Sequence, residues 1–65
     1  MGKPKVRNVR FARPIQETGK VIEIREFTDG KFDVFDADKK TILKGGIEDL
    51  FDALSFRAAH IEKVA

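Results

Sequence analysis

The chain has 65 residues, of which 37% are charged, and its formal net charge is +2 at pH 7. A chain of this length forms one domain with a thin hydrophobic core, and such domains commonly bury more apolar surface by forming a homodimer. The lack of cysteine excludes disulfides, iron–sulfur clusters and zinc–thiolate sites, and the lack of a long apolar segment predicts a cytoplasmic protein with no membrane span.

The chain begins with a predicted flexible basic tail over residues 1–5, where a glycine and a proline stand beside two lysines. Residues 6–65 are predicted to form a single domain, because no linker, repeat or low-complexity tract interrupts them. A first strand is expected over residues 6–11, followed by a turn over residues 16–19.

The faces of the first strand follow from its period of two. The alternation predicts that Val9 and Phe11 lie in the core. Arg10 would then point to the opposite, outer face of the sheet, and Arg7 is expected there as well, although strict alternation places it beside Val9.

The middle of the chain predicts an antiparallel meander. The strongest strand pattern covers residues 20–27, where β-branched residues alternate with charged ones. An Asp29-Gly30 pair is typical of a tight hairpin turn, and it leads into a second strand over residues 31–35. A short strand is expected over residues 41–44, so the meander has three or four strands.

The last third of the chain predicts one helix. Gly45-Gly46 is expected to end the strand pattern and to precede the helix. Six apolar residues then follow helical spacing and predict the face that packs on the sheet: Ile47, Leu50, Phe51, Leu54, Ala58 and Ile61. The predicted fold class is therefore α+β, a β-meander with a single C-terminal helix packed on one face.

Phe56 does not belong to this helical stripe and has three possible interpretations. It can be simply exposed, which is ordinary for a single phenylalanine. A kink at Ser55 can return it to the core. It can also form a dimer or partner contact together with Ala53 and Ala59.

The residue inventory predicts a protein that is not an enzyme and has no cofactor. The chain holds one serine, one histidine, no cysteine and no tyrosine, which leaves few nucleophiles or general bases. Ser55 and His60 would lie about 140° apart around a helix, so they do not form a pair. A calcium loop that began at Asp36 would have Lys40 at a ligand position and Thr41 at the position of the turn glycine, so no metal site is predicted.

The distribution of charge predicts binding to nucleic acid, either single-stranded DNA or RNA. Residues 1–25 carry seven basic and two acidic side chains, whereas residues 26–55 carry four lysines and eight acidic side chains. A basic sheet face can follow phosphates while an exposed aromatic side chain stacks on a base. The residues predicted to make these contacts are Arg7, Arg10, Arg13, Lys20, Arg25, Phe35 and Lys44.

The same sequence is compatible with a protein–protein interaction module or a small regulator. Its acidic hairpin, an exposed sheet edge and Phe56 would then contact a partner protein. This alternative predicts little affinity for nucleic acid.

Three short segments resemble a known family. The string from Gly19 to Phe27 resembles the central strand of the PC4-type transcriptional coactivators, which bind single-stranded DNA. The stretch Arg7–Arg10 is similar to the preceding strand of that family, and Lys44–Ile47 is similar to its Lys-Gly-Ile segment.

The resemblance implies a module of four strands and a C-terminal helix that dimerises and holds single-stranded DNA across its sheets. It also implies that Arg25, together with Arg10 and Lys44, contacts the DNA backbone. Pro14 and the turn before Gly19 have no counterpart in the family pattern.

Overall fold

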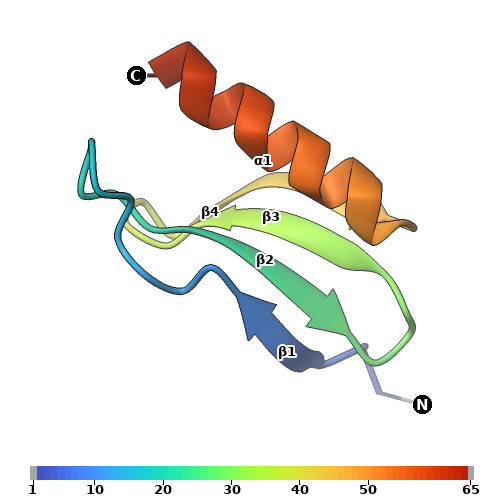
Figure 1. The fold of residues 1–65 in the computed structure, drawn as a ribbon. Helices are drawn as coiled ribbons and strands as arrows, with labels where there is room; N and C mark the ends of the chain where they lie inside the picture. Colours follow the sequence, from blue (N-terminus) through green and yellow to red (C-terminus); the bar gives the residue numbers. More distant parts are fainter. Residues whose placement is uncertain (1, 65) are drawn as a thin grey trace.

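Four antiparallel strands form one sheet in chain order, and one helix lies across one face of it (Figure 1). The computed structural model describes the backbone of residues 2–64 and the side chains of residues 2–63. The elements are β1 (Val6–Arg10), β2 (Ile22–Phe27), β3 (Phe32–Asp36), β4 (Thr41–Ile47) and α1 (Leu50–Val64). The predicted α+β meander with a single C-terminal helix is confirmed, and β1 takes the edge position beside β2.

The core lies between α1 and the two central strands. Alternating residues of β2 and β3 face the helix, and Ile22, Ile24 and Val34 are fully buried there. Ile24 pairs directly with Val34 across the two strands. Cross-strand pairs of β-branched residues pack well on a pleated surface, so this pair stabilises the centre of the sheet.

Two turns close the meander, each through a local hydrogen bond. Gly30 has a positive φ of 85°, and the Phe27 N–H donates to the Lys31 carbonyl, so the predicted hairpin closes through three loop residues. In the next turn the Asp36 carboxylate accepts hydrogen bonds from the N–H groups of Asp38 and Lys39. This role explains why Asp36 is buried although it is charged.

The predicted end of β4 at Gly45-Gly46 is wrong, because the strand continues to Ile47. Ile47 pairs with Phe32 on β3 and is buried in the core. The register of β3 and β4 shifts between the pair Phe32–Ile47 and the pair Val34–Lys44, and Gly46 has a positive φ of 65°. Glycine inside a strand often marks such a bulge instead of ending the strand.

The predicted helix face is confirmed at Leu50, Leu54 and Ile61 but wrong at its other two helical positions. Phe51 is 75% exposed and Ala58 is exposed, whereas Ala53 is fully buried. The error comes from Ile47, which belongs to β4 and therefore cannot set the phase of the helix. The contact face runs instead along Leu50, Ala53, Leu54, Arg57 and Ile61.

Phe56 lies at the margin of this contact face and packs partly against the core. The helix is continuous through Ser55, so no kink is needed to bring it there. The ammonium of Lys44 lies 5.6 Å from the centre of the Phe56 ring, and the His60 ring stacks on Phe56 with centroids 6.5 Å apart. Ala59 is exposed, but Ala53 is buried and cannot belong to a partner contact with it.

No helix in the described part of the chain is long and apolar enough to span a membrane.

Substitutions at one buried and one exposed position of α1 test this packing. We expect Ala53→Leu to lower the free energy of unfolding by about 1–3 kcal/mol, because added methylenes overpack the contact between helix and sheet. Phe51→Lys should change it by less than about 0.5 kcal/mol, as at other exposed positions. Urea denaturation of both variants measures the difference. A larger loss from Phe51→Lys than from Ala53→Leu would contradict the packing described above.

Candidate nucleic-acid interface

The side chains of β1 point the opposite way from the sequence prediction. Val9 pairs with Arg25 and shares the face of the sheet away from α1, whereas Arg10 pairs with Ile24 on the helix side. A register shift between Val6 and Asn8 interrupts the simple alternation. Among the described residues α1 packs on β2, β3 and β4 but does not reach β1, so β1 has no core face of its own.

Arg7 and Arg10 share one carboxylate. Arg7 donates to Oε2 of Glu26 at 2.5 Å and Arg10 donates to Oε1 at 2.9 Å. The hydrogen bond from Arg10, together with that from Arg7, holds the pKa of Glu26 below its ordinary value. Two guanidinium groups on one carboxylate leave the cluster with a net positive charge. Arg10 also lies over the Phe32 ring, 5.9 Å from its centre.

Arg25 lies on the other face of the sheet and is held in one plane. Its Nε and a terminal nitrogen both donate to the carboxylate of Asp33, at 2.9 and 2.5 Å. The hydrogen bond with Asp33 raises the pKa of Arg25 above its ordinary value. The guanidinium carbon lies 4.0 Å from the centre of the Phe35 ring and 5.5 Å from that of Phe27.

The Arg25–Asp33 pair lies on the face of the sheet that α1 leaves uncovered (Figure 1). We call this surface the open face; it comprises the apolar residues Val6, Val9, Phe27, Phe35 and Ile42 and the acidic Glu23 around the pair. Val6, Val9 and Ile42 are each at least 40% exposed. Asp33 neutralises Arg25, and Glu23 adds a negative charge opposite Phe35. The open face therefore offers flat and apolar contacts but no free positive charge of its own.

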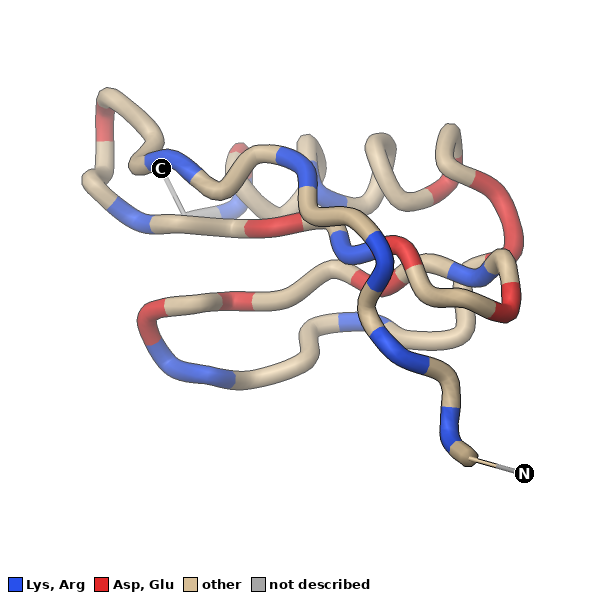
Figure 2. The backbone as a smooth tube through the Cα atoms, turned by 90° about the horizontal axis from the view of Figure 1, so that it is seen from below, with Lys and Arg blue, Asp and Glu red and all other residues tan. Residues whose placement is uncertain are grey.

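Positive charge gathers instead along the first strand and its flanks. Figure 2 shows the basic segments following one another from the N-terminus along β1 into the loop after it. We call this line the basic edge; it comprises Lys3, Lys5, Arg7, Arg10 and Arg13. Within the described residues its members form salt bridges with Glu26 alone. Two hydrogen bonds fix the start of this line to the sheet. The Lys5 N–H donates to the Thr28 hydroxyl, and the Thr28 N–H donates to the Lys5 carbonyl.

The seven residues predicted to bind nucleic acid do not share one surface. Arg25 and Phe35 lie together on the open face, and Arg7, Arg10 and Arg13 lie on the basic edge. Lys44 lies on the helix side of β4 over Phe56, and Lys20 precedes β2 with its carbonyl bonded to Ile15.

Three residues of the open face were missed by the sequence prediction, namely Val6, Val9 and Ile42. Val9 was assigned to the core, and Ile42 pairs with Phe35 only because β4 carries a register shift. No group of three or more potential metal ligands occurs among the described residues.

Comparisons with protein-family models, with curated proteins and with solved structures find no match for this chain.

The Glu26 cluster predicts how stability depends on pH. Because the pKa of Glu26 is lowered in the folded state, its contribution is complete above the ordinary value of 4.5. That contribution is lost as the pH falls through the lower, folded-state value. We expect Glu26→Gln to be less stable than the wild type at pH 7 and to lose less stability on acidification to about pH 3. Urea denaturation at both pH values measures this, and equal losses for the two proteins would refute the cluster's role.

Proposed function

We propose that the protein is a non-enzymatic domain that binds single-stranded nucleic acid, with phosphates along the basic edge and bases against the open face. One observation carries the proposal. A line of basic residues follows the edge strand beside a sheet face that no element covers in the described part of the chain. That face presents flat side chains, and Val9 of β1 pairs directly with Arg25 on it, whereas Arg7 and Arg10 turn to Glu26 on the helix side.

The basic edge provides the charge for phosphate contacts. Residues 2–13 contain five basic and no acidic side chains, and Glu26 is the one carboxylate that contacts them among the described residues. Lysine and arginine side chains that neutralise phosphates release bound counterions, which is the main source of affinity in such complexes. Arg7 is suited to this role because its side chain remains 61% exposed beside Glu26.

The open face provides the contacts for bases. Arginine planes and aromatic rings stack on unpaired bases, and this contact tolerates any sequence. Arg25 suits this role because Asp33 fixes its plane and Phe35 supports one side of it. Its role here is stacking, since its charge is already neutralised. A duplex keeps its bases inside the helix, so a single strand is the form that fits a flat apolar face.

The basic edge predicts a steep dependence of affinity on salt. We expect the double variant Lys5→Gln/Arg7→Gln to bind a labelled oligonucleotide more weakly and with a shallower salt dependence. Each lost phosphate contact should reduce the slope of log K against log salt by about 0.7, so two should reduce it by about 1.4. Arg10 remains in this variant to hold Glu26. Fluorescence anisotropy at several salt concentrations measures the slope.

The matched control removes two positive charges elsewhere. Lys39→Gln/Lys63→Gln changes the turn before β4 and the last turn of α1, which both lie away from β1. This control should keep the wild-type slope. If both double variants lose affinity equally, net charge and not the basic edge determines binding. If the wild type binds no strand even at low salt, the proposed function is wrong.

The stacking role of Arg25 has a separate signature. Arg25→Lys keeps the charge but removes the planar group. We therefore expect the free energy of binding to weaken by about 1–3 kcal/mol, the range for loss of one stacked base. The salt slope should stay unchanged, because no phosphate contact is lost. Phe27→Leu, which keeps an apolar side chain, should act in the same direction. A slope reduced in Arg25→Gln, which removes the charge, but kept in Arg25→Lys would show that Arg25 contacts phosphate instead.

A second candidate function is a protein-interaction module, and Phe51 favours it. This phenylalanine is 75% exposed on the outer side of α1, next to the acidic residues that begin the helix. In this alternative Phe51 takes the role that the sequence suggested for Phe56. A chain that binds no nucleic acid would direct attention to this surface.

A further inference from the structure

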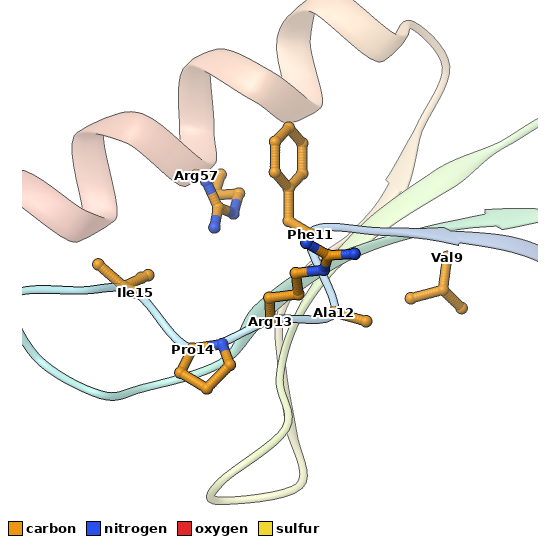
Figure 3. Close-up of a pocket in the computed structure, with 7 residues that line it drawn as sticks. All are labelled: Val9, Phe11, Ala12, Arg13, Pro14, Ile15 and Arg57. Carbon is orange, nitrogen blue, oxygen red and sulfur yellow. The ribbon is translucent and has the colours of Figure 1, made fainter.

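A pocket lies where the chain leaves β1 and passes beside α1. Its volume is about 550 Å³, and it is lined by Val9, Phe11, Ala12, Arg13, Pro14, Ile15 and Arg57. Figure 3 shows that Arg57 reaches into it from α1, whereas the other side chains come from the end of β1 and the loop after it. The volume falls within the range of small-molecule sites and exceeds what a single inorganic ion fills.

Arg57 occupies an unusual place for a charged residue. It lies in the middle of the helix face that packs on the sheet, where its Nε donates to the Ile22 carbonyl at 2.6 Å. Its guanidinium carbon lies 4.2 Å from the centre of the Phe11 ring. Burial lowers the pKa of Arg57. Within the described residues no carboxylate forms a salt bridge with it, so its two terminal nitrogens are left for a ligand.

Phe11 is held in a conformation that favours glycine. Its φ is 62°, which is rare for a bulky side chain and costs on the order of 1–2 kcal/mol. This backbone conformation sets the ring against Arg57 while the chain turns toward Arg13. Residues in such conformations cluster at binding sites, where the surrounding structure maintains them.

We infer that this pocket binds the phosphate monoester of a nucleotide, either a free mononucleotide or the 5′-terminal phosphate of a strand. Two guanidinium groups and no carboxylate line the pocket. Their two positive charges match a phosphate monoester, which carries about −1.5 to −2 at pH 7, better than they match a single carboxylate. The apolar walls and the Phe11 ring then contact the body of the ligand.

The inference that a nucleoside carries the phosphate rests on the proposed function. The phosphate itself is argued from the two arginines alone. The pocket continues the basic edge, because Arg13 belongs to both and Val9 belongs to both the pocket and the open face. A single strand of nucleic acid that lies along β1 therefore reaches the pocket where β1 ends.

The first test is an NMR titration of the ¹⁵N-labelled protein with adenosine 5′-monophosphate. We expect saturable shifts of the backbone signals of residues 9–15 and of the Arg57 Nε–H signal. Adenosine without phosphate should bind at least about 10-fold more weakly, since a charge-assisted hydrogen bond contributes that much. Equal binding of adenosine and its monophosphate, or no shift at millimolar nucleotide, would overturn the inference.

Variants locate the phosphate. Arg13 is exposed, so Arg13→Gln should fold normally and weaken nucleotide binding by about 10-fold, whereas Lys39→Gln, in the exposed turn before β4, should leave it unchanged. Arg57→Lys should act like Arg13→Gln if it folds. Unchanged binding by a folded Arg13→Gln protein overturns the inference whatever Arg57→Lys does.

A comparison of 5′-phosphorylated and 5′-hydroxyl oligonucleotides distinguishes the two sources of phosphate. Tighter binding of the phosphorylated strand, lost in Arg13→Gln, identifies the strand end as the ligand. Nucleotide binding without any strand binding supports the pocket for a free mononucleotide and refutes the proposed function. Strand binding without nucleotide binding or a 5′-phosphate effect refutes the pocket and leaves the proposed function in place.

Discussion

A single helix has to cover a four-stranded sheet, and it covers only one of the two faces. Within the described residues no element lies on the other side, so the fully buried core is limited to the layer between α1 and the central strands. The open face and the edge strand β1 are left to solvent or to a partner.

Arginine–carboxylate pairs satisfy the charged residues that lie on the strands of the sheet. Asp33 is almost fully buried on the open face, and the bidentate contact with Arg25 satisfies its carboxylate. Removing one partner of such a pair costs about 3–5 kcal/mol, because it leaves a buried charge without compensation. Glu26 is satisfied in a different way, by two arginines from β1. The contact attaches an edge strand that the helix does not reach, and it leaves one positive charge in excess.

The alternation of β2 allowed its buried face to be predicted, because its pairing with β3 is regular and α1 packs on one of its faces. The same reasoning failed for β1. A strand with no helix above it has no core that would select one face, and the shift at Asn8 changes the alternation.

The helix was predicted correctly as an element but not in its orientation. A glycine pair was interpreted as a break where it forms a bulge, which moved Ile47 from the strand into the helix and rotated the predicted stripe. Arg57 shows the remaining difficulty. Sequence patterns assign an arginine to the solvent, and only the position of the Ile22 carbonyl explains why it lies on the packed face.

The pairing of charges also decides which arginines can take part in binding. Counting basic residues in the first 25 positions suggested a positive sheet face, but Arg25 is neutralised by an acid three positions beyond the hairpin. Net charge along the sequence therefore overestimated the positive charge of the open face and underestimated that of the basic edge. On that edge Lys3, Lys5 and Arg13 form no salt bridge within the described residues. A ligand that needs both a flat apolar surface and a line of positive charge fits the boundary between the two. Single-stranded nucleic acid has this chemistry, because its phosphates lie along one side of the chain and its bases along the other.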